Sequence, residues 1–301
     1  MMTLLKERAS VLGLDPQWLL ARDAPGGLAV PGLVSANRHC RMLQTQDDWI
    51  AVNLAREDDR ALILALAGES CLPVWQVLQD MAAARTCHEL LQQLTELQVP
   101  AARIGEAEPL ALHSRPIARK ISCRVLDLSA LWAGPLCAGL LARAGAEVTR
   151  IESIGRPDPT PRSSPLLDRK INKGKSLLAL DLRTDAGKAA LLRAVDQADI
   201  LITSARAGAL RRIGLERESL RSKIWVAITA HGWSRDRVGF GDDCAAAGGL
   251  TRWHNGQPRF FGDALADPLT GLEAALAVLA GATGLIDMAM AQVAAAYAAS
   301  S

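Results

Sequence analysis

Short apolar runs alternate with helix-like segments along the second part of the chain. The runs have strand length and lie at 124–128, 147–151, 176–182, 200–202 and 224–229. Segments with helical apolar spacing lie between them, at 135–144, 184–198 and 207–213. Strands that alternate with helices form right-handed crossovers, so this order predicts an α/β fold with a mainly parallel sheet and flanking helices. Two apolar helices, 268–280 and 286–298, are expected to close the chain.

The first part of the chain has a different, mixed pattern. It predicts a helix at 4–20, short strands at 40–43 and 49–54, and amphipathic helices at 75–84 and 87–97. The segment 109–120 carries two prolines and is expected to be a connector. We therefore predict two domains, a small α+β domain at 1–117 and a larger α/β domain at 118–301.

Composition and charge exclude several classes of protein. Half of the 301 residues are hydrophobic, the net charge is +2, and Lys and Arg are scattered, which argues against a nucleic-acid binder with a basic face. No apolar stretch has the length of a membrane span, and charges interrupt the apolar start of the chain, unlike a signal peptide. The six cysteines form neither a CxxC pair nor a metal-ligand spacing with histidine. We expect a cytoplasmic protein with reduced thiols, no membrane contact and no metal site.

Two features favour an anionic ligand at the carboxyl ends of the strands. The small, Gly-containing loop 129–135 leads into a helix, whose N-terminus could hold a phosphate, although a tight turn is the more ordinary explanation. Five cations lie near the same expected sheet edge: Lys173, Lys175, Arg206, Arg211 and Arg212. They fit a polyanion such as a nucleotide or coenzyme A, and a solvated basic face is the competing explanation.

Asp267 is the carboxylate with the most informative surroundings. It precedes Pro268 and an apolar helix, so by spacing alone it is an N-cap with proline at the first helical position. The functional alternative is an exposed nucleophile held at a helix start. Asp242 and Asp243 form a second acidic group, while His231 and His254 have no spacing that pairs them and are expected to be structural.

Several motifs in register resemble the class III (CaiB/BaiF-type) CoA-transferases. The stretches that carry the resemblance are VLDLS at 125–129, WAGP at 132–135, LARAGAEV at 141–148, NKGKS at 172–176 and ADPLTGL at 266–272. The resemblance runs in order over about residues 122–290. It implies a Rossmann-like CoA-binding and catalytic domain in which Asp267 occupies the position of the family's catalytic carboxylate.

The resemblance also implies roles for other residues. Asp267 would carry CoA as an aspartyl-CoA thioester between an acyl-CoA and a carboxylic acid, with Asp243 nearby and Gly248 and Gly249 as the oxyanion-binding loop. CoA would lie near a set of loop and cationic residues: Leu131, Trp132, Ala133, Lys173, Lys175, Ser204 and Arg212. Trp132, unusual in its loop, could stack on the ligand. A homodimer is expected from the resemblance alone.

The first region resembles the family's small domain, which ordinarily follows the nucleotide-fold half. The stretches at 37–54 and 98–106 carry this similarity, so the chain is identified as a rearranged member. Some family residues that hold CoA are replaced, since Ser153 follows Glu152 and Ser204 precedes Ala205. These changes keep a non-catalytic acyl-CoA-binding subunit open. A racemase or isomerase of a 2-methylacyl-CoA is the third alternative. The family's racemases are expected to carry a histidine beside the aspartate of this segment, and this chain has Gly241, Asp242 and Asp243 there, without that histidine.

Overall fold

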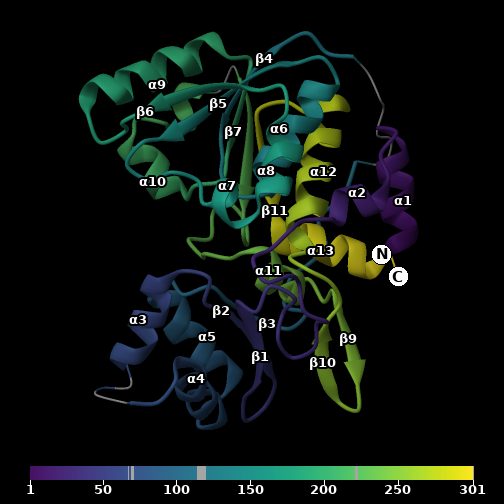
Figure 1. Ribbon diagram of the computed structural model, residues 1–301, viewed down its shortest axis with the longest axis vertical. Coiled ribbons are helices and arrows are strands. Elements are labelled where there is room, and N and C mark those ends of the chain that lie inside the picture. The colour runs from purple at the N-terminus through teal and green to yellow at the C-terminus, as the bar shows by residue number, and fades with distance from the viewer. Residues whose placement is uncertain (67, 69–70, 114–119, 221–222, 301) are drawn as a thin grey trace.

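A computed structural model describes residues 1–66, 68, 71–113, 120–220 and 223–300 (Figure 1). Its centre is a six-stranded parallel sheet in the order β11-β8-β7-β4-β5-β6. The strands are β4 (Arg124–Leu128), β5 (Glu147–Ser153), β6 (Ser176–Leu180), β7 (Ile200–Thr203), β8 (Ile224–Thr229) and β11 (Leu285–Ala289). The chain leaves β4 toward β5 and β6 and later returns to β7, so β4 and β7 flank the topological switch point, where this class of sheet binds ligands. The predicted α/β fold is confirmed.

Apolar side chains point alternately to the two faces of the sheet along each strand, which explains why both faces are covered by helices. Val125, Ile200 and Val226 pack into one core, while the neighbouring Leu126 and Leu201 pack into another, because successive strand side chains point to opposite faces. The helices on the first face are α6 (Ala133–Arg143), α8 (Pro165–Asn172), α12 (Ala266–Leu279) and α13 (Met290–Ala299). Those on the second face are α9 (Asp185–Gln197) and α10 (Ala207–Arg212), together with a 3-10 turn at Glu218–Leu220. The short helix α7 (Thr160–Ser163) contacts α8.

A smaller antiparallel sheet, β1-β2-β3, lies below the parallel sheet in Figure 1. Its strands are β1 (Cys40–Gln44), β2 (Trp49–Asn53) and β3 (Ala101–Arg103), and its helices are α3 (Glu57–Leu66), α4 (Val74–Ala83) and α5 (Cys87–Glu96). These elements share a core of their own, in which Ile50, Leu78 and Leu90 are fully buried. The helix α11 (Gly241–Ala247) lies between the two sheets and contacts β2, β3, α12 and α13.

The first two helices pack on the larger part of the molecule. They are α1 (Met2–Ser10) and α2 (Pro16–Leu20), and their Leu5 and Leu19 are buried in the same core as α6 and α12. Arg8 of α1 forms a buried ion pair with Glu273 of α12. The division into domains at residue 117 stays a prediction, and half of the proline-containing connector 109–120, namely 114–119, lies outside the described residues.

Three local expectations were wrong or incomplete. The predicted helix 4–20 is interrupted between α1 and α2, where Gly13 adopts a positive φ and Asp15 caps a new helix that begins with Pro16. The predicted helix 286–298 begins instead as strand β11, and α13 follows it directly. The hairpin of β9 (Thr251–His254) and β10 (Gln257–Phe260) was not anticipated, nor were α3, α11 and β3. Within the described ranges, no helix is both long and apolar enough to cross a bilayer.

Candidate active site

Asp267 lies where the N-termini of two helices converge. Helix α12 begins at Ala266 with Leu265 at its N-cap position and no capping side chain, so the interpretation of Asp267 as an N-cap is wrong. Its partly exposed carboxylate instead accepts a hydrogen bond from the backbone N–H of Ala133, the first residue of α6. Both helix N-termini direct positive partial charge toward the carboxylate, which suits an anionic nucleophile.

A glycine permits this convergence. A Cβ atom on Gly271 would lie 2.6 Å from the carbonyl oxygen of Ala133 and 3.0 Å from Leu136, so only glycine lets α12 approach α6 this closely. A Cβ on Gly241 would likewise lie 2.2 Å from Oδ2 of Asp267. The carboxylate therefore sits against the backbone of α11 on one side and at the start of α6 on the other.

Asp267 lies near two other carboxylates, Asp242 and Asp263, whose charges raise its pKa. Burial raises the pKa of Asp267 to about 7, Arg22 opposes this rise, and Asp242 and Asp263 add to it. Burial and the neighbouring Asp263 raise the pKa of Asp242 to about 6. Carboxyl groups with pKa values raised toward neutrality occur at functional sites and also in buried structural networks, so this shift makes Asp267 a candidate when taken together with its place at two helix starts.

The loop after β4 reaches this cluster from the switch point. The N–H of Ala130 donates to Oγ of Ser204 after β7 (3.0 Å), which ties the two sides of the switch point together. Leu131 has a φ of +68°, is 36 % exposed, and donates its N–H to Asp158 (3.0 Å). Leu131, Ala133 and Ser204, predicted to lie near CoA, are thus close to Asp267 or to the switch point.

Other predicted CoA contacts lie elsewhere. Lys175 is buried, and its ammonium donates to Asp127 (2.8 Å) and to two further oxygens, so it holds the core together and is not available to a phosphate. Trp132 is 2 % exposed and packed between the cations of Arg22 and Lys170, which leaves its ring no free face for stacking.

Two further predicted cations, Lys173 and Arg212, are exposed to solvent. Lys173 lies in the exposed turn before β6. Arg212 is at the last residue of α10, about 8 Å along the helix axis from its start at the switch-point edge. Neither cation has a partner in the cluster around Asp267, and their contact with CoA stays a prediction.

The pair Gly248 and Gly249 does not form an oxyanion-binding loop in this structure. Their N–H groups donate to the carbonyls of Cys244 and Ala246 and so complete the C-terminus of α11. A Cβ on Gly248 would lie 2.5 Å from Ala294, so this glycine serves the packing of α11 against α13. The pair is also a full seven-residue helix away from Asp267, about 10 Å along the axis.

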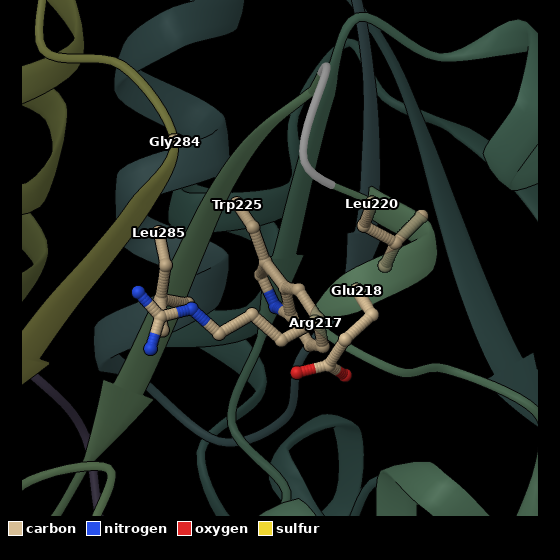
Figure 2. A pocket seen from close by; sticks show the side chains of 6 residues that line it. All are labelled: Arg217, Glu218, Leu220, Trp225, Gly284 and Leu285. Atoms are coloured by element: carbon tan, nitrogen blue, oxygen red, sulfur yellow. The ribbon is translucent and has the colours of Figure 1, made fainter.

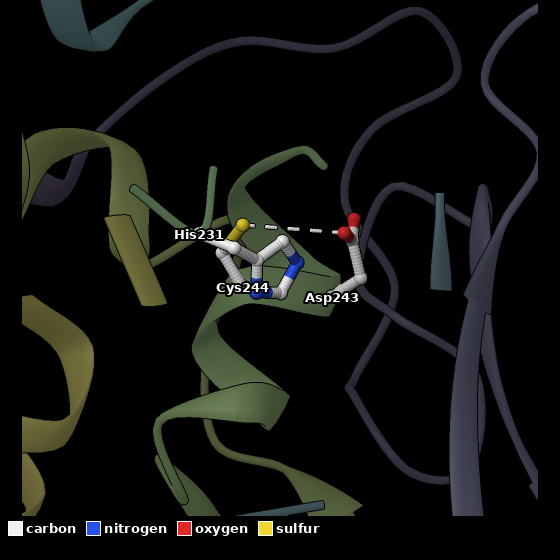
Figure 3. Close-up of side chains that lie close together, drawn as sticks. All are labelled: His231, Asp243 and Cys244. Carbon is white, nitrogen blue, oxygen red and sulfur yellow. Dashed lines mark hydrogen bonds between the residues drawn. The ribbon is translucent and has the colours of Figure 1, made fainter. Parts of the chain in front are cut away.

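Asp243 is buried beside His231 and Cys244 (Figure 3). Its carboxylate accepts hydrogen bonds from the N–H of Phe240 (3.0 Å) and the amide of Asn53 (3.1 Å), and burial raises its pKa to about 8. Burial lowers the pKa of His231 to about 3. The carboxylate is already hydrogen-bonded to Phe240 and Asn53, so we interpret the three groups as part of a packed polar core.

A separate cavity of about 320 Å³ lies at the opposite edge of the parallel sheet (Figure 2). Trp225 and Leu285, which line it, stand at the amino ends of β8 and β11. Ligands of this class of sheet bind at the carboxyl ends, so the cavity is not part of the site around Asp267.

Three polar residues of the site were missed from the sequence. Arg22 forms a two-point ion pair with Asp263 (2.5 and 2.8 Å), and Asn37 donates to both Asp242 (2.6 Å) and Asp263 (3.1 Å). Asn53 pairs with Asp243. All three come from the first region, more than 180 residues away from their partners, and no motif or periodicity links such positions.

Comparison with protein families identifies the second part of the chain. The model of CoA-transferase family III matches residues 122–299, more than half of the chain. Succinyl-CoA–D-citramalate CoA-transferase of Chloroflexus aurantiacus is 33% identical over 173 residues, which cover 52% of this chain and 43% of that protein. Succinate–glutarate CoA-transferase of Agrobacterium fabrum is 31% identical over 180 residues, 52% of this chain and 45% of that protein.

A solved structure agrees with the sequence comparison. A CaiB/BaiF family protein from Brucella suis superposes with a TM-score of 0.53 at 27% identity, over 59% of this chain and 55% of that chain. The chain spans less than half the length of the two curated relatives. The family match begins after the first region, so the proposed likeness of that region to the small domain stays a prediction.

Proposed function

The chain belongs to CoA-transferase family III, and from that premise we propose that it moves coenzyme A between an acyl-CoA and a carboxylic acid with Asp267 as nucleophile. The observation that carries the proposal is the position of Asp267 itself. A partly exposed carboxylate receives an N–H from the start of α6, beside the switch point of a parallel sheet. The two relatives named above are CoA-transferases acting on acids that carry two carboxylates, and we extend only the reaction type to this chain.

The first half of the reaction loads CoA onto the protein. An oxygen of the Asp267 carboxylate attacks the thioester carbonyl of the acyl-CoA, which forms a mixed anhydride and releases the CoA thiolate. The thiolate then attacks the aspartyl carbonyl, which releases the donor acid as a carboxylate and leaves an aspartyl-CoA thioester. Covalent catalysis of this kind divides one difficult transfer into easier steps.

The second half returns the protein to its starting state. The carboxylate of the acceptor acid attacks the aspartyl-CoA thioester, which gives a second anhydride and frees the thiolate again. Attack of the thiolate on the acceptor carbonyl yields the new acyl-CoA and regenerates the Asp267 carboxylate. The N–H of Ala133 is the group in this structure that is placed to bind the aspartyl oxygen during these steps.

The test is a mass measurement of the intact protein after mixing with a panel of acyl-CoAs. The proposal predicts an adduct of the mass of CoA less one water, as a thioester requires, that hydroxylamine removes and that is absent from Asp267→Asn. Asp181→Asn is a matched control, because Asp181 is partly exposed and paired with Arg183 in the turn after β6. Binding of CoA without an adduct would instead support the non-catalytic acyl-CoA-binding subunit.

Assembly and location are proposed on the resemblance alone. A homodimer and a cytoplasmic location are expected, and sedimentation of the purified chain would test the first. A monomer that still forms the CoA adduct would show that dimerisation is not needed for the chemistry.

A further inference from the structure

Hydrogen bonds to α8 hold the backbone on both sides of Arg22, at the end of α2 and at Asp23. The Asp23 carboxylate accepts from the N–H groups of Leu166 and Leu167 at the start of α8 (3.1 and 3.0 Å). The ammonium of Lys170, one turn further along α8, donates to the carbonyls of Trp18 and Ala21. Arg22 therefore projects from a backbone that is fixed before and after it.

The guanidinium of Arg22 forms an ion pair within the carboxylate cluster. It binds both oxygens of Asp263, and the two side chains are only 19% and 9% exposed. A two-point ion pair fixes orientation as well as distance. Asn37 then bridges Asp263 to Asp242, whose other oxygen accepts the N–H of Ala264 (2.8 Å).

The same guanidinium also lies near the ring of Trp132 in the loop after β4. It lies 5.5 Å from the centre of the Trp132 ring, and Trp132 directly precedes Ala133, the donor to Asp267. Contacts thus run from Arg22 through Asp263 to the first turn of α12, and through Trp132 to the first residue of α6. Asp267 stands where these two paths meet.

The charges around Asp267 determine how readily its carboxyl group ionises. The charged and titratable groups that face Asp267 are Arg22 after α2, Asp242 and Cys244 in α11, and Asp263 before α12. The acidic neighbours raise the pKa of Asp267 and Arg22 lowers it. A nucleophilic carboxylate must be ionised, so a cation among three carboxylates favours the reactive form.

We propose that Arg22, which lies outside the family-matched residues, is a positioning residue that keeps the Asp267 carboxylate charged and oriented toward the loop after β4. The inference rests on the proposed role of Asp267 as nucleophile. Arg22 need not touch the substrate, because it acts through Asp263, Trp132 and its charge.

The experiment titrates Asp267 directly, in protein labelled with carbon-13 at the aspartate side-chain carboxyls. The Asp267 signal is identified by its loss in Asp267→Asn. In Arg22→Gln we expect the titration midpoint to rise by about one pH unit, because the nearest cation is removed. Arg22→Lys keeps the charge and should keep most of the original midpoint. Arg22→Met, which retains the aliphatic stem against Trp132, serves as the second variant if glutamine is not tolerated.

Arg143→Gln is the matched control. Arg143 also packs on an aromatic ring of the first segment, Trp18 (5.4 Å), but it lies at the far end of α6, about 15 Å along the axis from Ala133. It should leave the midpoint unchanged. An unchanged midpoint in folded Arg22→Gln or Arg22→Met would overturn the proposal.

A second readout separates this inference from the proposed function. At pH 6 the CoA adduct should form about tenfold more slowly in Arg22→Gln than in the wild type, and at pH 9 the two rates should converge. If the rate of adduct formation in Arg22→Gln were reduced equally at both pH values, Arg22 would have a merely structural role and the proposal would be overturned. If the Asp267 midpoint rises in Arg22→Gln as expected but the wild-type protein forms no adduct, the proposed function would be wrong, while the coupling of Arg22 to Asp267 would stand.

Discussion

The two parts of this molecule contribute different things to the site. Residues 122–299 match the family and supply Asp267, its hydrogen-bond donor Ala133 and the glycines that bring α6, α11 and α12 together. The first region lies outside that match and supplies Arg22, Asn37 and Asn53, the polar groups that pair with the carboxylates. The proposed nucleophile comes from one part, while charged and polar groups around it come from the other.

The motif that carries a proposed nucleophile therefore need not contain the groups that set the pKa of that nucleophile. The motif around Asp267 fixes where the carboxylate stands, because the helix start and Gly271 are local in sequence. Its pKa depends on charges that the fold brings from distant positions. Changes in the first region should therefore alter the ionisation of Asp267 without removing the nucleophile.

The largest effect should come from breaking the buried link between the two parts. Arg8→Ala leaves Glu273 buried without its guanidinium partner, and we expect the free energy of unfolding to fall by about 3–5 kcal/mol. Chemical denaturation measures this loss. The double variant Arg8→Met with Glu273→Leu should recover much of it, because neither charge remains buried. A loss below about 1 kcal/mol, typical of surface pairs, would contradict the buried link.

A smaller loss should follow from separating α12 and α6. Gly271→Ala places a methyl group 2.6 Å from the Ala133 carbonyl oxygen, and we expect a destabilisation of about 1–3 kcal/mol together with slower adduct formation. Gly208→Ala in α10 is the matched control, since its nearest neighbour is 4.0 Å away, and it should be neutral or stabilising by about 0.5–1 kcal/mol. Equal effects of the two substitutions on adduct formation would show that the close approach is irrelevant to the site.

The smallest effect concerns charge within the cluster. The rate of adduct formation should rise with pH, with a midpoint near pH 7 and a plateau about one pH unit higher, because burial raises the pKa of Asp267 to about 7 and only the ionised form attacks. Asp242→Asn removes one of the charges that raise this pKa, so the midpoint of the pH–rate profile should move below that of the wild type. A midpoint that stays or rises would show that Asp242 does not act on Asp267 by charge.

The sequence predicted the parallel sheet because short apolar runs and helical spacing alternate regularly over 118–301. The prediction failed at 286–298, because a mostly apolar segment does not distinguish β11 followed by α13 from one helix. Helix-capping rules misplaced Asp267, because its partner Ala133 is 134 positions earlier in the chain and only the packing of α12 on α6 brings them together. The role of Asp267, which the resemblance implies, stays a prediction. Lys175 was misjudged because a lysine beside glycine suggests a surface loop, whereas the fold buries it against Asp127.

The most direct test of the central claim follows the oxygens of the reaction. In the proposed sequence, each acceptor carboxylate leaves one of its oxygens on the Asp267 side chain when the second anhydride is cleaved. Turnover with an acceptor acid labelled with oxygen-18, followed by mass mapping of the digested protein, should therefore place heavy oxygen in the peptide that contains Asp267 and in no other. Transfer of CoA to the labelled acid without heavy oxygen at Asp267 would contradict the account.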